Sequence, residues 1–261
     1  MLNLIKANFY LLKKSGTVKL LFLLSLVSAL VMAGISHNMA TSEVSQQVAG
    51  IGSFFADFQM VSLLGIIIAS SLICSDFQSK IVQDSISCGN SRMNIIISKT
   101  IVYAISIGII LLPYVVISFI GFCTGSDFQA FLPSTFLNLM ANEGDYSLSV
   151  SVFFKILALF IGVFTLYVGE LSISVLLGYT LRKPAAVIGV GYIINLFLAK
   201  LSTVDGIKDI LAYTPFGLEF FGKLELGCSI MDIIKPIIIS LVFIVVVVFI
   251  TNIIFKKSEV K

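Results

Sequence analysis

One carboxylate stands out in the sequence because it lies inside a long apolar run. Glu170 belongs to the stretch LFIGVFTLYVGELSISVLLGY. A charged side chain at the centre of a bilayer costs roughly 2.5 kcal/mol or more unless it is protonated, hydrated or paired. Glu170 therefore indicates a water-filled path or a substrate contact, to which Tyr167 and Ser174 on the same run could contribute. The alternatives are a polar tie to another helix and a position nearer the membrane surface.

Other chemical signatures are missing from the sequence. The only histidine is His37, and the four cysteines form no CxxC pair, so no zinc cluster can be assembled at the usual spacing. There is no GxxxxGK[ST] loop, no HExxH and no GxSxG. One interior carboxylate cannot act as both acid and base. We expect no catalytic residue, metal or cofactor on this chain, and we interpret the cysteines as packing residues, with a Cys123–Cys228 bridge as the alternative.

The composition indicates that a membrane surrounds most of the chain. Hydrophobic residues make up 58% of the sequence and charged residues only 12%, and the mean hydropathy is +1.07. A soluble domain of this size needs more polar residues to cover its core. The absence of a long basic block argues against nucleic-acid binding. The sequence thus predicts an all-α, polytopic membrane protein, with residues 1–261 forming a single transmembrane domain.

Six apolar runs are long enough to cross a bilayer, which needs roughly 20 residues. They are Val18–Ile35, Phe54–Cys74, Ile95–Phe122, Val152–Thr180, Ala185–Leu201 and Ile233–Phe255. Pro113 lies inside the third run and should kink it. The lysines before the first run also fit a cleaved leader, but the leader would be unusually long, so we expect an uncleaved span.

The first 16 residues have apolar side chains at helical spacing with lysine and asparagine between them. This spacing therefore predicts that residues 1–16 form a helix that lies at the cytoplasmic interface. The alternative is a cytoplasmic extension of the first span.

Basic residues are distributed unequally between the two sides of the predicted spans. With both termini inside, 12 of the 17 basic residues are cytoplasmic: Lys6, Lys13, Lys14, Lys19, Lys80, Arg92, Lys99, Arg182, Lys183, Lys256, Lys257 and Lys261. The positive-inside rule therefore predicts two cytoplasmic termini. It places 75–94 inside as a connector, and 123–150 and 202–231 outside. The outer segment YTPFGLEFFG is too apolar for an ordinary loop and predicts short interfacial helices or a dip into the outer leaflet.

Small residues mark two predicted helix faces. Gly162, Thr165, Gly169 and Ser172 recur at spacings that place them on one face, where they would allow close approach of another helix, within the chain or between protomers. Gly189, Gly191 and Asn195 predict a similar face on the fifth span.

The connector between the second and third spans has the most informative pattern. It begins with Asp76 and continues with an amphipathic stretch, Ile81 to Ile86. A small-residue turn, Gly89 to Arg92, precedes the pair Ser98 and Lys99 at the start of the third span. This pattern resembles the ABC-2 type permeases, in which an acid, "TIK", a turn with G-x-S-R and "SK" commonly follow one another. The six spans, the interfacial first helix and the YTPFG segment extend the resemblance in architecture along the whole chain.

The sequence departs from the family pattern at two points. Lys80, Ile81 and Val82 stand where "TIK" is common, and Cys88 is an unusual neighbour of the glycine. The resemblance implies that the connector is a coupling helix that docks into a groove of a separate ATPase subunit. The docking residues would be Ile81, Val82, Asp84, Ser85, Ile86, Cys88, Gly89, Asn90 and Arg92.

In that interpretation the connector residues have different roles. Ile81, Val82 and Ile86 would form an apolar face, and Asp84 and Arg92 would set the register by charge pairing. Gly89 would adopt a positive φ and turn the chain back to the bilayer. The alternative is an ordinary cytoplasmic hairpin.

The resemblance implies the transmembrane subunit of an ATP-binding-cassette exporter in a bacterial plasma membrane. Two cytoplasmic ATPase subunits would bind ATP and Mg²⁺, and a second permease copy would complete the pathway, most simply as a homodimer. The size of the chain resembles that of members that export amphipathic or antimicrobial peptides, so a peptide or another apolar substrate is expected, in contact with membrane lipid. The alternatives are an immunity protein that sequesters a toxic peptide without pumping, and an intramembrane enzyme that uses Glu170.

Overall fold

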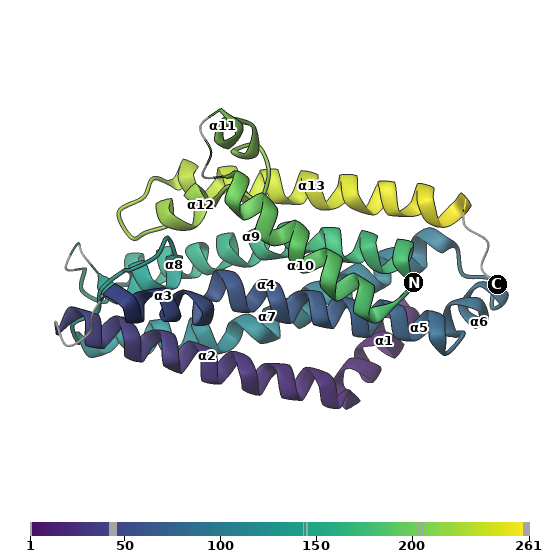
Figure 1. The fold of residues 1–261 in the computed structure, drawn as a ribbon, viewed down its shortest axis with the longest axis horizontal. Coiled ribbons are helices and arrows are strands. Elements are labelled where there is room, and N and C mark those ends of the chain that lie inside the picture. Colours follow the sequence, from purple (N-terminus) through teal and green to yellow (C-terminus); the bar gives the residue numbers. More distant parts are fainter. Residues whose placement is uncertain are drawn as a thin grey trace.

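In the computed structural model, the described residues are 2–41, 46–142, 144, 146–202, 204 and 206–257, and all regular elements among them are helical (Figure 1). Within these ranges, six segments are long and apolar enough to span a membrane: Gly16–Ala40, Asp57–Gln78, Arg92–Thr124, Val150–Leu181, Pro184–Leu201 and Ile230–Lys257. The predicted all-α fold with six spans is confirmed. The chain is therefore a multi-pass membrane protein.

The observed helices extend beyond most of the predicted ends. Helices α2 (Gly16–Ala40), α7 (Arg92–Thr124), α9 (Val150–Leu181), α10 (Pro184–Leu201) and α13 (Ile230–Lys257) form five of the spans. Their ends include polar turns that hydropathy does not detect. The Ser91 hydroxyl accepts a hydrogen bond from the backbone N–H of Asn94 at the start of α7. The Ser149 hydroxyl accepts one from the backbone N–H of Val152 at the start of α9. Such caps satisfy the first free donors of a helix.

The second span is built from three consecutive pieces. These are α4 (Asp57–Ala69), a π-helical segment η1 (Ser70–Cys74) and α5 (Ser75–Gln78). The predicted boundaries at Phe54 and Cys74 are shifted, because Phe54 belongs to the separate helix α3 (Gln46–Phe55) and the span continues past Cys74. A π-helical turn inserts one extra residue into a helix and is often found at functional sites.

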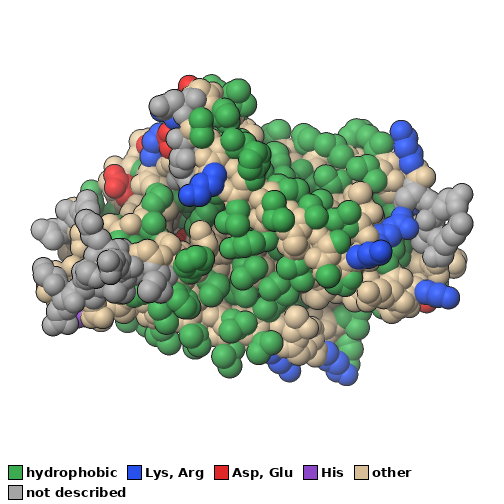
Figure 2. Space-filling view, viewed as in Figure 1, with side chains coloured by type: hydrophobic (Ala, Val, Ile, Leu, Met, Phe, Trp, Pro, Cys, Tyr) green, Lys and Arg blue, Asp and Glu red, His purple; other side chains and the backbone are tan. Residues whose placement is uncertain are grey.

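The spans run lengthwise beside one another, so the connecting segments lie at two ends (Figure 1). One end contains α1 (Leu2–Lys14), α5, α6 (Ile81–Ser87) and the last turns of α13; we call it the basic end. The opposite end, which we call the loop end, contains α3, α8 (Thr135–Ala141), α11 (Ile207–Leu211) and α12 (Leu218–Lys223). In Figure 2, most of the visible lysine and arginine side chains lie toward the basic end, a few lie around α11 and α12, and most of the visible acidic side chains are also around α11 and α12.

The loop end is held together by contacts between two segments that are distant in sequence. The Thr135 hydroxyl of α8 donates to the carbonyl of Phe221 at 3.2 Å, and the Asn138 amide donates to the carbonyl of Gly222 at 3.1 Å. The predicted short helices in 202–231 are present as α11 and α12. Cys123 and Cys228 are both free thiols in the structure.

Small residues on α9 face α13, as predicted for close helix packing. A Cβ atom at Gly169 would lie 2.9 Å from the Cβ of Ser240, and one at Gly162 would lie 3.7 Å from Ile233. On α10 the two glycines differ: a Cβ at Gly191 would meet Ile66 of α4 at 3.0 Å, whereas Gly189 has no such neighbour within 4 Å. Close packing within the chain therefore uses Gly191 and not Gly189.

Parts of the sequence predictions fall on residues outside the described ranges. These are Met1 of the interfacial helix, Lys261 of the charge comparison, and residues 143, 145, 203 and 205 of the two predicted outer segments.

Candidate functional site

The two ends of the connector motif meet in space. Asp76 of α5 and Lys99 of α7 form an ion pair with an Nζ–Oδ2 distance of 2.5 Å, and both side chains are buried. The same ammonium donates to the carbonyl of Leu72 at 3.2 Å. Because Leu72 lies in η1, Lys99 binds to the segment in which the regular helical hydrogen-bond pattern is altered. The ion pair fixes the beginning of the connector against the beginning of the third span.

The N-terminal helix contacts the same region. The amide of Asn8 on α1 donates to the hydroxyl of Ser98 on α7 at 3.4 Å, and both residues are buried. Ser98 is the neighbour of Lys99 in the predicted motif. Helix α1 is therefore attached directly to the base of the connector.

Two residues with a left-handed backbone conformation delimit the exposed part of the connector. Lys80 has a φ of 59° immediately before α6, and Gly89 has a φ of 84° after it. The positive φ predicted for Gly89 is confirmed. Asn90 then closes the turn, because its backbone N–H and its side-chain amide both donate to the carbonyl of Ser85, at 3.2 and 3.1 Å. The short helix is thus presented between two sharp turns.

The predicted docking residues of α6 point in different directions. Ile81, Asp84, Cys88 and Gly89 are exposed, and Ser85, Ile86 and Asn90 are partly buried. Val82 is only 3% exposed and belongs to the hydrophobic core of the chain. The apolar part of the exposed face therefore consists of Ile81 and the accessible part of Ile86, without Val82.

Arg92 forms contacts within the chain. Its guanidinium donates to the carbonyls of Phe255 and Lys256, at 2.5 and 2.9 Å, and its Cζ lies 5.2 Å from the centre of the Phe255 ring. These carbonyls belong to the last turn of α13, where free acceptors remain and a cation is favourable. Arg92 therefore attaches the C-terminus of α13 to the start of α7.

Phe255 belongs to an aromatic cluster that the sequence analysis did not predict. Phe77 of α5, Tyr179 of α9 and Phe255 of α13 have ring centroids 5.1 to 6.1 Å apart. The chain's second arginine, Arg182, lies 4.9 Å from the centre of the Phe77 ring. We call Phe77, Tyr179 and Phe255, with Arg92 and Arg182, the aromatic clasp. Its members lie far apart in sequence, so no local spacing could have identified it.

Glu170 lies in a buried polar group between three spans. Ser62 of α4 donates to Glu170 Oε1 at 3.0 Å, and the Asn195 amide of α10 donates to the same oxygen. Glu170 is 2% exposed, and its Oε2 atom has no hydrogen-bond partner among the described residues. These contacts match the interpretation of Glu170 as a polar tie between helices. Tyr167 and Ser174 are also buried.

A second buried carboxylate was missed. Asp57 is fully buried at the start of α4, although the sequence analysis regarded Glu170 as the only clearly interior acid. The Ser134 hydroxyl donates to Asp57 Oδ1 and the Tyr167 hydroxyl to Oδ2, both at 2.7 Å. The signal was available, since Asp57 lies inside the predicted second span. Tyr167 thus binds Asp57 and not Glu170.

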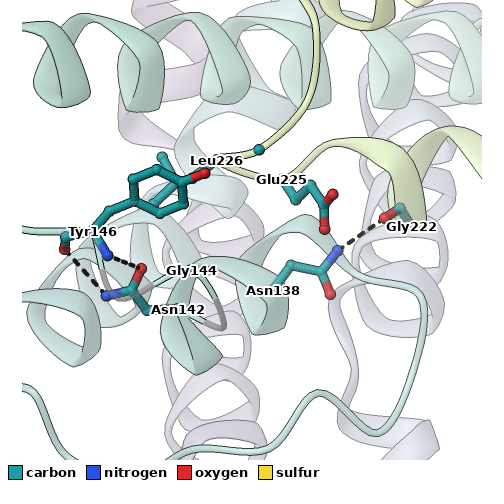
Figure 3. Close-up of a pocket in the computed structure, with 8 residues that line it drawn as sticks. Asn138, Asn142, Gly144, Tyr146, Gly222, Glu225 and Leu226 are labelled. Atoms are coloured by element: carbon teal, nitrogen blue, oxygen red, sulfur yellow. Dashed lines mark hydrogen bonds between the residues drawn. The ribbon is translucent and has the colours of Figure 1, made fainter.

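Two pockets near the loop end are lined by residues other than Glu170. At the loop end, a pocket of about 280 Å³ lies beside α8 and α12, with Tyr146, Asn142 and Glu225 around it (Figure 3). The Asn142 side chain exchanges two hydrogen bonds with the backbone of Tyr146, each of 3.2 Å. A second pocket of about 260 Å³ reaches Asp57 and Lys200. Among the described residues, no group of three or more histidine, cysteine or acidic side chains is placed to hold a metal ion.

Comparisons with known proteins do not assign a family, so the interpretation depends on the structure of the chain itself. No protein-family model matches the chain, and no curated protein matches its sequence.

Proposed function

We propose that this chain is the transmembrane subunit of an ABC-2 type exporter. One observation supports the proposal most strongly. The acid at the start of the connector pattern, Asp76, pairs with Lys99 at its end, so residues that are separate in the motif form one structural unit. This unit presents the exposed face of α6 at the basic end, the end of the bundle that also contains α1 and the last turns of α13 (Figure 1).

The proposed orientation places the basic end in the cytoplasm, with both termini on that side of a bacterial plasma membrane. The support is the distribution of lysine and arginine, since inner loops of membrane proteins are enriched in these residues. Figure 2 shows basic side chains at this end. A cytoplasmic ATPase could then reach α6.

In this proposal, two ATPase subunits bind ATP and Mg²⁺ and dock on α6 of two permease copies. Ile81 and Ile86 enter the groove of the ATPase, and Asp84 sets the register. Movement of α6 passes through Asp76 to α7, and through Phe77 to α9 and α13, because Phe77 packs in the aromatic clasp. The passage between the permease copies carries an amphipathic or antimicrobial peptide.

The contacts of Glu170 give no support to an intramembrane enzyme. Its Oε1 atom accepts two side-chain hydrogen bonds, and its side chain is 2% exposed. A substrate would have no access to this carboxyl group in the observed conformation.

Co-expression with the ATPase of a neighbouring reading frame, recognised by its Walker A motif, tests the proposal. We expect the two chains to co-purify in detergent and to drive ATP-dependent export of peptide from vesicles. The variant Ile81→Asp/Asp84→Lys changes an apolar and an acidic residue, both exposed, on α6. It should reduce co-purification about tenfold or more, since interface anchors contribute at least that much.

A matched control makes the same two replacements at the loop end. Ile207→Asp/Asp209→Lys also changes an exposed isoleucine and an exposed aspartate, on α11, and should leave the complex intact. Unchanged binding of the α6 variant would contradict docking at the connector. Peptide protection by the chain without any ATPase would favour a sequestering immunity protein instead.

A further inference from the structure

A groove of about 480 Å³ lies at the elbow between α1 and α2. Its lining combines apolar side chains from three helices with two lysines: Phe9, Leu12, Lys13, Val18, Lys19, Phe22 and Ile109. Ile109 belongs to α7, so the groove lies between the N-terminal helix and two spans. This combination is not used by the proposed ATPase docking.

The backbone creates the groove by an abrupt change of direction. Ser15 has an extended conformation, with φ −64° and ψ 119°, and separates α1 from α2. Leu12 and Val18 on the two sides of this break are buried against Val102 of α7. They form the floor, whereas Phe9 and Phe22 are 43% and 36% exposed and form walls. The floor is therefore buried and apolar.

Two uncompensated cations stand at the groove. Lys13 is in the last turn of α1 and Lys19 is in the first turns of α2, and both are exposed. Among the described residues neither forms an ion pair, and the sequence has no acidic residue before Glu43. Lys14 differs, since its ammonium lies 4.8 Å from the centre of the Tyr10 ring. Lys13 and Lys19 are thus available to an anion.

We propose that this groove binds an anionic phospholipid. The apolar floor between the start of α2 and the middle part of α7 fits an acyl chain, and the two lysines fit the phosphate of the headgroup. A zwitterionic lipid would leave part of the lysine charge uncompensated, because the positive group of its headgroup repels the two lysines. The lipid would occupy the angle between α1 and α2. The proposal requires only that the chain spans a membrane and is independent of the ATPase partner.

Native mass spectrometry of the full-length protein tests the site. The protein is reconstituted in vesicles of equal parts phosphatidylglycerol and phosphatidylethanolamine, extracted in mild detergent, and analysed for bound lipid. We expect the natural chain to retain phosphatidylglycerol preferentially. Lys13→Gln/Lys19→Gln should reduce this preference roughly 10- to 30-fold, in line with the attraction of anionic lipid to each basic residue.

Two further variants separate a specific site from general attraction. Lys6→Gln/Lys14→Gln also removes two positive charges, both from α1, but does not alter the groove lining. This variant should therefore keep the preference for phosphatidylglycerol. Ile109→Trp fills the groove and keeps both lysines, so it should reduce the amount of retained phosphatidylglycerol at least severalfold. Thermal unfolding in detergent verifies that each variant is folded.

The pattern of all three variants decides the result. Equal losses in the two lysine variants would overturn the proposal, because they would indicate diffuse attraction. Undiminished retention by Ile109→Trp would also overturn it, since the acyl chain would not occupy the groove. Equal retention of the two lipids by the natural chain would contradict the assigned role of Lys13 and Lys19.

Discussion

At the scale of single residues, the buried charges of this chain have defined partners. Asp76 is paired with Lys99, Asp57 accepts two hydroxyl groups, and Glu170 accepts a hydroxyl and an amide. A charged group without such partners is costly in an apolar surrounding. Substitutions at these positions therefore separate residues that support the fold from residues that contact a substrate.

Removing one partner of the buried ion pair should destabilise the protein strongly. Lys99→Met leaves Asp76 buried without a cation, and we expect a loss of about 3–5 kcal/mol in the free energy of unfolding. The double variant Lys99→Met/Asp76→Leu should recover much of this loss, because no buried charge then remains unpaired. Denaturant unfolding in detergent measures both.

The exposed neighbour Lys80 provides the control for this prediction. Lys80→Met lies on the same connector and should change the free energy of unfolding by no more than about 0.5 kcal/mol. A similarly small effect of Lys99→Met would show that the pair does not hold the connector.

Glu170 should tolerate an amide better than an apolar side chain. Glu170→Gln keeps an acceptor for Ser62 and Asn195, so folding and peptide export should both be retained. Glu170→Leu removes the acceptor of the Asn195 amide, whereas the Ser62 hydroxyl can still donate to the carbonyl of Phe58, and it should cost about 1–3 kcal/mol. Unfolding and vesicle transport assays test the two variants. Loss of export in a stably folded Glu170→Gln protein would indicate a direct role of the carboxylate in the path.

At the scale of elements, the six spans could be predicted because a long apolar run is a local property of the sequence. The ends were less accurate, since they depend on caps such as Ser91 and Ser149. The π-helical segment Ser70–Cys74 and the aromatic clasp could not be predicted, because both depend on contacts between different helices. The Gly89 turn was predictable from the conformational freedom of glycine alone.

The packing of α9 against α13 gives a prediction at this scale. Gly169→Leu would place a side chain where a Cβ already approaches Ser240 to 2.9 Å, so the helices must separate. We expect a loss of about 1–3 kcal/mol, as for other overpacked interiors. The melting temperature in detergent provides the measurement.

Gly189→Leu is the matched control, because the space around Gly189 is open. It makes the same replacement in another span and should leave the melting temperature close to that of the natural protein. A larger decrease for Gly189→Leu than for Gly169→Leu would contradict the observed packing.

At the scale of the whole molecule, the two ends differ in chemistry. The basic end combines α1, the connector and the end of α13, and the loop end combines α8, α11 and α12 (Figure 1). The sequence alone predicted this division from its charges, although it could not show that Asp76 and Lys99 meet. The proposed function depends on which end faces the cytoplasm.

Two natural thiols are suitably placed to measure this orientation. Cys88 is exposed beside α6, Cys123 is exposed at the other end of α7, and Cys74 is buried. Cys228 is partly buried, and burial raises the pKa of its thiol, which lowers its thiolate fraction and its reactivity at neutral pH. Replacing Cys228 and one of the two exposed cysteines with serine leaves a single reactive position.

Labelling these two proteins with a membrane-impermeant maleimide tests the central claim most directly. In intact cells, we expect the maleimide to label the protein that retains Cys123 and not the protein that retains Cys88. Inverted vesicles washed free of peripheral proteins should label Cys88. Labelling of Cys88 in intact cells would place the connector outside, beyond the reach of any cytoplasmic ATPase, and would contradict the proposed function.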